Sequence, residues 1–315
     1  MGFDIIGDIH GHHDKLLALL KLMGYRKRAG AWRCSGRSAV FVGDLIDRGP
    51  GQLATVDLVR RMVDAGSARC VMGNHEFNAI AWSMPDPLVP GEYLRPHGKP
   101  GNRAQHEKFL TAVENTPRHA DIVDWFRTLP LWIDLQGIRV VHACWDEPSM
   151  QKLRPFMGPG DTLTDELMLM GSRPGSWAYA AIETICKGPE VELPNGAAFY
   201  DKSGKRRTEV RVRWWQSDLS TYRKAAIGPA EEMALIPDAP MPETWRAHGI
   251  EGTPVVFGHY WFSGTPTVIS GQFACIDYSV ATDGPLVAYR WDGESEMTSD
   301  KLAWAGAEAA PWVLT

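Results

Sequence analysis

Two aspartates and an arginine lie close together in the stretch FVGDLIDRGP, residues 41–50, just after an apolar run. Asp44 and Asp47 are three residues apart, and carboxylates that close repel each other unless a cation lies near them. Arg48 follows directly and offers a planar guanidinium of the kind that binds carboxylate or phosphate oxygens. The types and spacing of these residues predict a site that holds a cation, an anion or both.

The same arrangement, a polar residue directly after an apolar segment, recurs along the chain. The five stretches carry Asp8 and His10 in GDIHG, Asp44 in GDLIDRG, Asn74 and His75 in GNHE, His142 in VVHAC, and His259 in VFGHY. Any one of these residues alone is more often an ordinary loop residue or a hydrogen-bonded histidine, but together they predict one shared site. Carboxylate, imidazole and amide ligands suit manganese, iron or zinc, and the absence of cysteine from these candidate ligands argues against a closed structural zinc site. Two ions about 3.5–4 Å apart that share a carboxylate are the usual dinuclear arrangement.

The elements that position these residues can be predicted from hydrophobic periodicity. The first part of the chain fits strands over 3–8, 39–44 and 68–74, alternating with helices over 14–24, 52–66 and from 75 onward. Such alternation is typical of a parallel sheet covered by helices. Two of the strands end in Gly-Asp and the third ends in Gly-Asn. Because ligands of α/β sheets lie beyond the carboxyl ends of the strands, the polar residues should gather at one edge.

The rest of the chain is predicted to complete one α/β sandwich with an inserted cap. Its expected elements are helices and loops over 85–130, strands over 131–144, mostly helix over 147–187, a β-hairpin over 190–215 with its turn at DKSGK, a strand over 253–260, and two antiparallel strands in TVISGQFACIDYS and PLVAYRWDG. The economical division is a single domain over 1–315 with a substrate-side insert at about 145–250.

Composition and charge limit the class of protein. With 315 residues, of which 44% are hydrophobic and 23% charged, the chain has the make-up of a globular protein. A formal net charge of −5 argues against binding to a membrane surface or to extensive duplex nucleic acid. The five cysteines are dispersed without CxxC spacing, which is typical of free thiols in a reducing compartment. Without a signal-like start, a transmembrane run or a heptad seam, we expect a cytoplasmic monomer.

The ordered set GDIHG, GDLIDRG, GNHE, VHA and GH resembles the calcineurin-like metallophosphoesterase superfamily. The DRG and GNHE elements are similar to its bacterial phosphoprotein-phosphatase branch, near the symmetrical diadenosine tetraphosphatases and the phosphatase module of bacterial polynucleotide kinase-phosphatases. The resemblance covers roughly residues 3–145 and 253–280. It implies a four-layer αββα sandwich with two divalent metal ions at the edge of the sheets, manganese first, with iron or zinc as alternatives.

The resemblance also implies a role for each residue of the motifs. Asp8, His10 and Asp44 would hold the first ion, and Asp44 would bridge to the second, which Asn74, His142 and His259 would complete. A hydroxide between the ions would attack phosphorus in line. His75 would protonate the leaving oxygen and would be kept cationic by Asp47, while Arg48 would bind the phosphate. On this interpretation the two aspartates of the opening stretch face cations rather than each other.

The sequence departs from related branches at two places. The run GHYWF lacks the second histidine of a GHxH motif, as in the phosphoprotein-phosphatase branch. The run DYSV stands where bacterial members often carry DTGC, and its Asp277 would support a metal-bound histidine from outside the ligand set. The resemblance further calls for a second phosphate-binding arginine. Arg213 is the first candidate and Arg211 the second, and a solvent-exposed hairpin face is the alternative for both.

The motifs favour one class of substrate and leave others open. Asp47, which the tetraphosphatases typically lack, favours hydrolysis of phosphate monoesters, with a phosphoprotein, a nucleotide or another phosphorylated small molecule as substrate. A symmetrical dinucleoside tetraphosphate hydrolase is the alternative. A non-catalytic metal-binding scaffold is a third hypothesis, but a decayed site usually loses a ligand or the acid histidine, and here each position is filled. In the insert, the KSGKRR turn with Trp214 and Trp215 is expected either to grip a nucleotide or to form a solvent-facing hairpin with one buried tryptophan.

Overall fold

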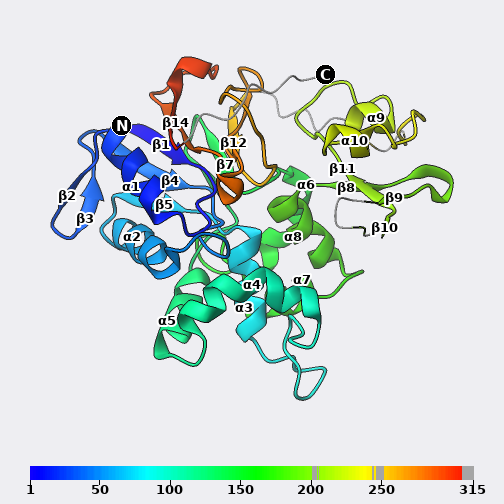
Figure 1. Cartoon of the computed structure of the whole chain (residues 1–315), viewed down its shortest axis with the longest axis horizontal. Coiled ribbons are helices and arrows are strands. Elements are labelled where there is room, and N and C mark those ends of the chain that lie inside the picture. Colours follow the sequence, from blue (N-terminus) through cyan, green and yellow to red (C-terminus); the bar gives the residue numbers. More distant parts are fainter. Residues whose placement is uncertain (201–203, 205, 243–244, 246–251, 307–315) are drawn as a thin grey trace.

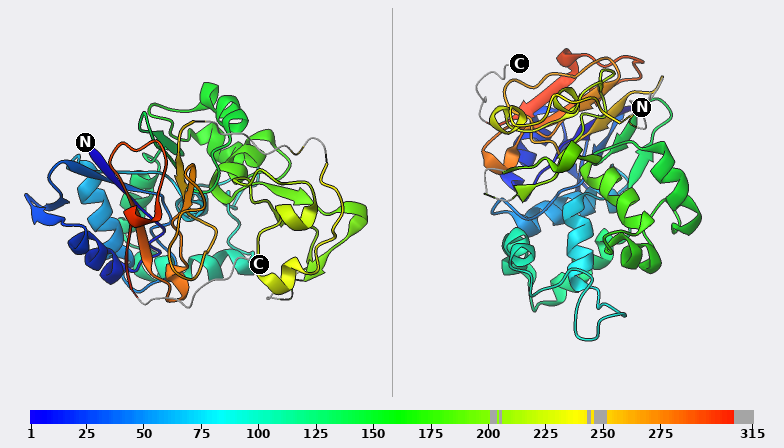
Figure 2. Two further views of the ribbon diagram at one scale, coloured as in Figure 1. Left: turned by 90° about the horizontal axis from the view of Figure 1, so that it is seen from above. Right: turned by 90° about the vertical axis from the view of Figure 1, so that its right-hand side faces the viewer.

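A pair of β-sheets packed face to face forms the centre of the computed structural model, which describes residues 1–200, 204, 206–242, 245 and 252–306 (Figure 1, Figure 2). The first sheet has five strands in the order β15–β14–β1–β4–β5. Their bounds are Gly2–Ile6 for β1, Arg37–Phe41 for β4, Ala68–Cys70 for β5, Leu286–Trp291 for β14 and Leu302–Ala305 for β15. β1, β4 and β5 run parallel, as predicted, and β14 is antiparallel to both of its neighbours.

The second sheet has four strands in the order β13–β12–β7–β6. Their bounds are Trp132–Asp134 for β6, Arg139–Val141 for β7, Val255–Phe257 for β12 and Phe273–Cys275 for β13. The prediction that the strand in TVISGQFACIDYS is antiparallel is wrong, because β13 pairs in parallel with β12, with Val255 opposite Phe273. The loop between them returns the chain to the end of the sheet where β12 begins. β13 therefore runs in the same direction as β12.

Alternating side chains of the two sheets give each sheet two buried faces. Ile5 and Val40 of the first sheet pack against Val140 and Val256 of the second in one cluster between the sheets. The adjacent residues of the same strands, such as Ile6, point the other way into the larger cluster beneath the helices. A strand that is buried on both faces reads as a continuous apolar run, which is how these strands appear in the sequence.

Helices cover the outer face of each sheet, which completes a four-layer αββα sandwich (Figure 1). On the first sheet lie α1 (His13–Leu22) and α2 (Gln52–Asp64). Toward the second sheet lie α6 (Glu147–Leu153), α7 (Asp165–Gly171) and α8 (Trp177–Lys187). A further group packs beside the strand ends: α3 (Asn74–Ser83), α4 (Pro100–Val113) and α5 (Pro117–Phe126). None of the helices in the described part of the chain has the length and apolarity that a membrane span needs.

Smaller elements extend from this body. β2 (Arg26–Arg28) and β3 (Ala31–Arg33) form a hairpin beside the first sheet. The remaining short elements are β8 (Glu190–Glu192), β9 (Phe199–Tyr200), β10 (Arg206–Arg207), β11 (Glu209–Arg211), α9 (Tyr222–Ala225), α10 (Ala230–Met233), and 3-10 turns at Arg154–Phe156, Pro194–Gly196, Val280–Thr282 and Ser299–Lys301. Figure 1 places β8 to β11, α9 and α10 together at one side of the molecule.

The hairpin predicted over 190–215 is present in part. β8 pairs with β11 and β9 pairs with β10, both antiparallel, but the strand ends at Arg211. Most of the expected DKSGK turn, residues 201–203 and 205, lies outside the described residues. Val191, Val210 and Val212 pack with residues up to Met241 in a cluster separate from those of the sandwich. This part of the chain therefore has its own small core.

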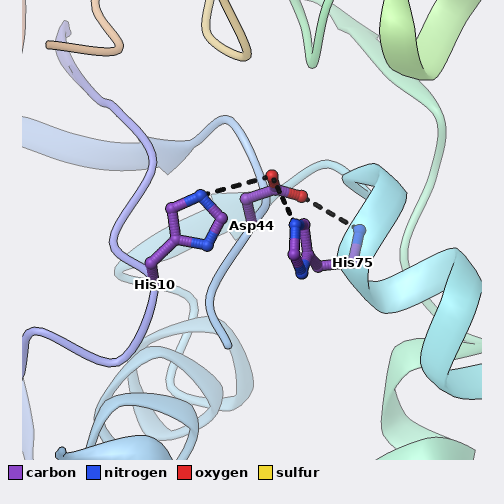
Figure 3. Close-up of side chains that lie close together, drawn as sticks. All are labelled: His10, Asp44 and His75. Carbon is purple, nitrogen blue, oxygen red and sulfur yellow. Dashed lines mark hydrogen bonds and ion pairs between the residues drawn. The ribbon is translucent and has the colours of Figure 1, made fainter. Parts of the chain in front are cut away.

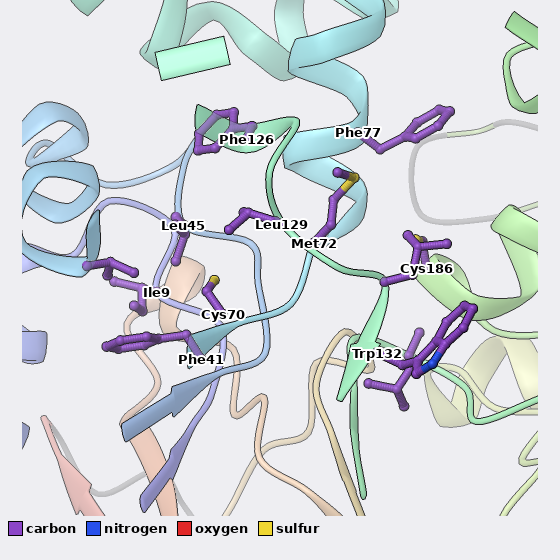
Figure 4. Close-up of a cluster of buried hydrophobic side chains, with 14 of the residues drawn as sticks. Ile9, Phe41, Leu45, Cys70, Met72, Phe77, Phe126, Leu129, Trp132 and Cys186 are labelled. Atoms are coloured by element: carbon purple, nitrogen blue, oxygen red, sulfur yellow. The ribbon is translucent and has the colours of Figure 1, made fainter. Parts of the chain in front are cut away.

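The loops at the strand ends are anchored in the main core. Figure 4 shows Ile9, Leu45 and Met72 among its buried side chains, together with Phe41 and Cys70 of the strands. Ile9, Leu45 and Met72 have no exposed surface. Because apolar residues of these loops are fixed by close packing, the polar residues next to them are held on rigid backbone.

Candidate active site

The polar residues at the strand ends meet at one edge of the two sheets. They follow β1, β4 and β5 in the first sheet and β7 and β12 in the second. All six predicted ligands are buried, with 9% or less of each residue exposed: Asp8, His10, Asp44, Asn74, His142 and His259. Figure 3 shows the side chains of His10 and His75 converging on the carboxylate of Asp44. The structure thus brings together residues that are up to 251 positions apart in the chain.

Unusual backbone conformations turn the site residues toward this centre. Ile9, between Asp8 and His10, is buried on the opposite side. His10, Asp44 and His259 have φ angles of 50°, 50° and 72°, in the left-handed region. Asp, Asn and His tolerate this region better than other side chains, but it still costs about 1–3 kcal/mol at each position when the surrounding structure enforces it. Three of the six predicted ligands therefore lie on strained backbone at the points where strands open into the site.

Glycines next to the ligands leave the space that two carboxylates occupy. A Cβ atom added at Gly73 would lie 2.2 Å from Oδ1 of Asp44, and one added at Gly258 would lie 1.9 Å from Oδ1 of Asp8. No side chain fits at such distances, because the carboxylate already fills the position of its first carbon. The glycines of GNHE and GHYWF are therefore part of the site, although they contribute no ligand atom.

Asp44 lies at the centre of two groups of side chains. Its Oδ2 is 3.6 Å from Nε2 of His10 and 3.8 Å from Nε2 of His75, and its Oδ1 is 3.4 Å from Nε2 of His142. Two sets of candidate ligand atoms each lie within 4.8 Å of one another: His10, Asp44 and His75 in one, and Asp44, His142 and His259 in the other. Asp44 is the member common to both sets.

Several buried atoms of the site lack a hydrogen-bond partner in the described structure. These atoms are Oδ1 of Asp8, Nε2 of His10 and Nε2 of His259. The Nδ1 atoms of His10 and His142 each donate to a backbone carbonyl, at 2.9 and 2.7 Å, which directs both Nε2 atoms toward the centre, where each has its lone pair when the ring is neutral. Nε2 of His142 lies 3.2 Å from Oδ1 of Asn74, another predicted ligand. Buried polar atoms are seldom left without a partner. A divalent cation fits this set, since it would accept each of these lone pairs.

The electrostatics of the centre favour the same occupant. Burial and the nearby charge of Asp277 raise the pKa of Asp8 well above its usual value. Burial lowers the pKa of His10 to about 4 and lowers that of His259 well below its usual value, which favours the neutral ring that binds metals. His142 differs, because burial opposes its protonation but the charge of Asp44 outweighs burial and raises its pKa to about 10. The site therefore combines two histidines that favour the neutral form with carboxylates that favour a positive charge beside them, as the raised pKa of His142 shows.

His75 and Asp47 form a close pair at the side of this centre. Nδ1 of His75 lies 2.6 Å from Oδ2 of Asp47, and both residues are buried. Burial opposes protonation, but the charges of Asp44 and Asp47 outweigh it and raise the pKa of His75. Burial also opposes ionisation of Asp47, yet hydrogen bonds from His106 and His75 lower its pKa. The structure thus brings the two side chains of the predicted pair together, and the directions of both pKa shifts favour a protonated imidazole beside an ionised carboxylate.

Two residues of the site were not predicted from the sequence. Glu76 is fully buried, and its two oxygens accept the backbone N–H groups of Asp44, Leu45 and Gly73 at 2.8, 2.8 and 3.0 Å, which ties the loop after β4 to the start of α3. Burial raises the pKa of Glu76 to about 7. The glutamate of GNHE was the available signal. The other residue, His106 on α4, contacts Asp47, and its signal was a histidine on an apolar helix face.

The predicted arginines lie at different places. The guanidinium of Arg48 lies 5.8 Å from the ring of Trp261, which is 47% exposed, and Nε of Arg48 has no hydrogen-bond partner in the described structure. The structure records no contact between the Arg213 side chain and the ligand side chains within the described part of the chain. After burial, the charge of Arg211 is the largest influence that lowers the pKa of His259. Arg211, the second candidate, thus has its charge near the centre.

Asp277 supports a loop rather than a histidine ring. Its Oδ2 accepts the N–H of Trp261 at 2.8 Å and its Oδ1 accepts that of Ser279 at 3.0 Å. For the described residues, no hydrogen bond from Asp277 to a histidine ring is recorded, so the expected direct support of a ligand is not seen. Burial raises the pKa of Asp277 to about 6. Its place is to fix the loop that follows His259.

The expectation that the paired tryptophans grip a nucleotide is wrong, and so is the alternative with one buried tryptophan, because both are buried. Trp214 and Trp215 are 2% and 7% exposed. Nε1 of Trp214 donates to the carbonyl of Ala143 and to the hydroxyl of Tyr260, both at 3.0 Å, and the Trp215 ring lies 4.7 Å from that of Tyr260. The chain leaves its strand pairing after Arg211, so both indoles turn inward and brace the loops that carry His142 and His259.

Comparisons with known proteins agree with these motifs. A family model described as calcineurin-like phosphoesterase matches residues 1–191. The asymmetrical bis(5'-nucleosyl)-tetraphosphatase PrpE of Oceanobacillus iheyensis is 28% identical over 178 residues, 56% of this chain and 67% of that protein. The symmetrical bis(5'-nucleosyl)-tetraphosphatase of Vibrio cholerae is 31% identical over 299 residues, 91% of this chain and 94% of that protein. The cold-active protein-tyrosine phosphatase of a Shewanella species has a TM-score of 0.48 at 17% identity, with 95% of this chain and 80% of that chain covered.

The length that is matched varies between relatives. For four further asymmetrical tetraphosphatases the chain covers only 31% to 56% of the relative. The family model, by contrast, spans more than half of this chain and includes the motifs from GDIHG to VHA. The chain therefore belongs to the calcineurin-like phosphoesterase family, whose members are hydrolases of phosphate esters that depend on divalent metal ions.

Proposed function

We propose that the protein binds two divalent metal ions and hydrolyses phosphate monoesters. One ion would be held by Asp8, His10 and Asp44, and the other by Asp44, Asn74, His142 and His259. The unpartnered atoms of Asp8, His10 and His259 and the central place of Asp44 support this assignment. Manganese is the first choice for this set of oxygen and nitrogen ligands, with iron and zinc as alternatives.

When bound, the two ions supply a nucleophile from water at neutral pH and neutralise charge on the phosphoryl oxygens. The residues of the chain perform the remaining tasks. His75 donates a proton from Nε2 to the leaving oxygen, since its Nδ1 is engaged by Asp47. Arg48, at the edge of the site, binds the phosphate with its planar guanidinium. Either Arg213 or Arg211 supplies a second positive charge.

The observation that carries the choice of monoesters is the 2.6 Å pair of His75 and Asp47. An alkoxide is a poor leaving group and needs a proton, whereas a nucleotide phosphate is already a good one. A site in which a buried carboxylate keeps an imidazole protonated is suited to an alkoxide, the poorer of the two leaving groups. A phosphoprotein, a nucleotide monoester or another phosphorylated small molecule would fit.

The second candidate is hydrolysis of dinucleoside tetraphosphates. It is favoured by the names of the curated relatives, among which the symmetrical tetraphosphatase of Vibrio cholerae matches nearly the whole chain. The asymmetrical relatives match mainly the first part of the chain. On either substrate, we propose that the insert at about 145–250 selects what enters the site. Its later part supports this, because residues 191–241 have a small core of their own, whereas α6 to α8 pack into the main core of the sandwich.

The substrate class is tested with metal-stripped protein resupplied with Mn²⁺. The substrates are p-nitrophenyl phosphate, a phosphoserine peptide and diadenosine tetraphosphate. We expect phosphate from the first two, restored by Mn²⁺. Cleavage of the dinucleotide alone would assign the second candidate, and its products would tell the mode: two nucleoside diphosphates from symmetrical cleavage, or a mono- and a triphosphate from asymmetrical cleavage. Inactivity on all three with full metal content would contradict both.

The Gly258→Ala variant is expected to bind less metal, because its new Cβ would occupy the place of Oδ1 of Asp8. Overpacking of this kind costs roughly 1–3 kcal/mol of stability. The matched control is Gly98→Ala, where a Cβ would meet nothing within 4 Å. Metal content per chain and thermal unfolding check the prediction. Equal metal content in both variants would show that Asp8 is not a ligand.

A further inference from the structure

We propose that His106 is a positioning residue of the acid pair, which fixes Asp47 in the orientation that holds His75. The inference rests on the proposed function, in which His75 donates the proton. His106 lies in α4, outside every strand-end motif. Its Nδ1 is 2.7 Å from Oδ1 of Asp47, the oxygen that His75 does not use.

Asp47 is held from both sides and through its backbone. Its two oxygens lie 2.6 Å from His75 and 2.7 Å from His106, and its own N–H donates to Oε1 of Gln52 at 2.8 Å. The Asp47 side chain is 2% exposed, so solvent cannot replace a lost donor at the same geometry. Because each oxygen has its own imidazole, the carboxylate has one orientation in which both bonds form.

In the described part of the chain, the side chain of His106 has no recorded hydrogen-bond partner besides Asp47. It is 1% exposed, its ring lies 5.0 Å from that of Phe109 and 6.0 Å from that of Trp82, and its Nε2 has no hydrogen-bond partner in the described structure. A carboxylate oxygen can only accept a hydrogen bond, so the Nδ1 atom that lies 2.7 Å from it carries a proton. His106 is therefore a donor directed at Asp47.

This donor has a consequence for His75. With Oδ1 of Asp47 satisfied by His106, Oδ2 accepts from Nδ1 of His75, which places Nε2 of His75 on the site side, 3.8 Å from Asp44. Without His106, a buried carboxylate oxygen is left unpaired, and Asp47 gains by rotating toward any other donor. The bond that orients His75 then weakens, while the metal ligands are untouched.

The test compares His106→Leu, which keeps volume but loses the donor, with His106→Asn, whose side-chain N–H can take the place of Nδ1. The control is His119→Leu, because His119 packs on the same Phe109 ring at 5.8 Å and does not contact Asp47. Turnover is measured on an alkyl phosphate and on p-nitrophenyl phosphate, with metal content per chain. We expect His106→Leu to lower kcat on the alkyl ester by roughly 10–100-fold, as loss of an outer support typically does, with KM, metal content and the aryl ester little changed.

Two further readouts separate positioning from a structural role. His106→Asn should recover most of the lost kcat, and His119→Leu should lose none. In the Zn²⁺-loaded protein, the low-field proton resonance of the short His75–Asp47 hydrogen bond, assigned by its absence in His75→Asn, should move upfield in His106→Leu. That resonance requires no turnover, so it tests the inference even if the proposed function fails. An unmoved resonance, or equal losses on both esters, would overturn the proposal.

Discussion

The Asp44→Asn variant is expected to lose metal binding and phosphate release together. Asp44 is common to both groups of candidate ligands, and its oxygens lie 3.4–3.8 Å from Nε2 of three histidines. Asparagine keeps the shape but removes the charge and turns one ligand oxygen into a donor. Because bound ions lower the activation barrier by several kcal/mol, activity should fall by about 10³-fold or more when they are lost.

The measurement is metal content per chain after equilibration with Mn²⁺, together with turnover. Asp4→Asn is the matched control, since Asp4 is also a fully buried aspartate but accepts from Arg37 and Arg290 at 2.9 and 3.0 Å, away from the ligands. The control should lose stability, by roughly 1–3 kcal/mol, and keep both ions. Two bound ions and normal turnover in Asp44→Asn would exclude a bridging role.

The His75→Asn variant is expected to keep both ions and lose turnover according to the leaving group. General acid catalysis contributes typically 10²–10⁴-fold, so the alkyl phosphate should slow by about that factor. The nitrophenolate of p-nitrophenyl phosphate leaves without a proton and should slow far less. Asparagine retains an N–H that can meet Asp47, so the fold around the site is preserved.

Metal analysis decides between two roles for His75, because its Nε2 is also 3.8 Å from Asp44 and it belongs to one of the candidate metal groups. A drop in metal content with equal loss on both esters would make His75 a ligand. Asp47→Asn serves as the companion variant. Its loss of turnover should depend on the leaving group in the same way as that of His75→Asn, but the loss should be smaller.

The strand-end residues could be found in the sequence because their signal is local. Glycine followed by a carboxylate, amide or imidazole at the end of an apolar run reports a buried strand that opens into a loop, and parallel strands bring such ends together. The packing around Gly73 and Gly258 gives the reason for the glycines. The parallel order of β1, β4 and β5 followed from the same alternation.

The features that could not be predicted from the sequence depend on contacts between distant parts of the chain. The direction of β13 is set by the path of a loop, which periodicity does not record. Trp214 and Trp215 sit beside arginines in the sequence, yet they turn inward because the strand pairing ends before them. His106 lies on the apolar face of α4, and only the meeting of that helix with the loop after β4 turns it from a core histidine into a partner of Asp47.

The left-handed backbone at the strand ends has a consequence for how this chain evolves. His10, Asp44, Asp47 and His259 all have φ between 50° and 89°, where glycine is at ease and other residues are strained. Replacing any of them by glycine would relieve the backbone strain at that position but would also remove a predicted metal ligand or a member of the predicted acid pair. Low backbone strain and the proposed activity therefore favour different residues at these four positions.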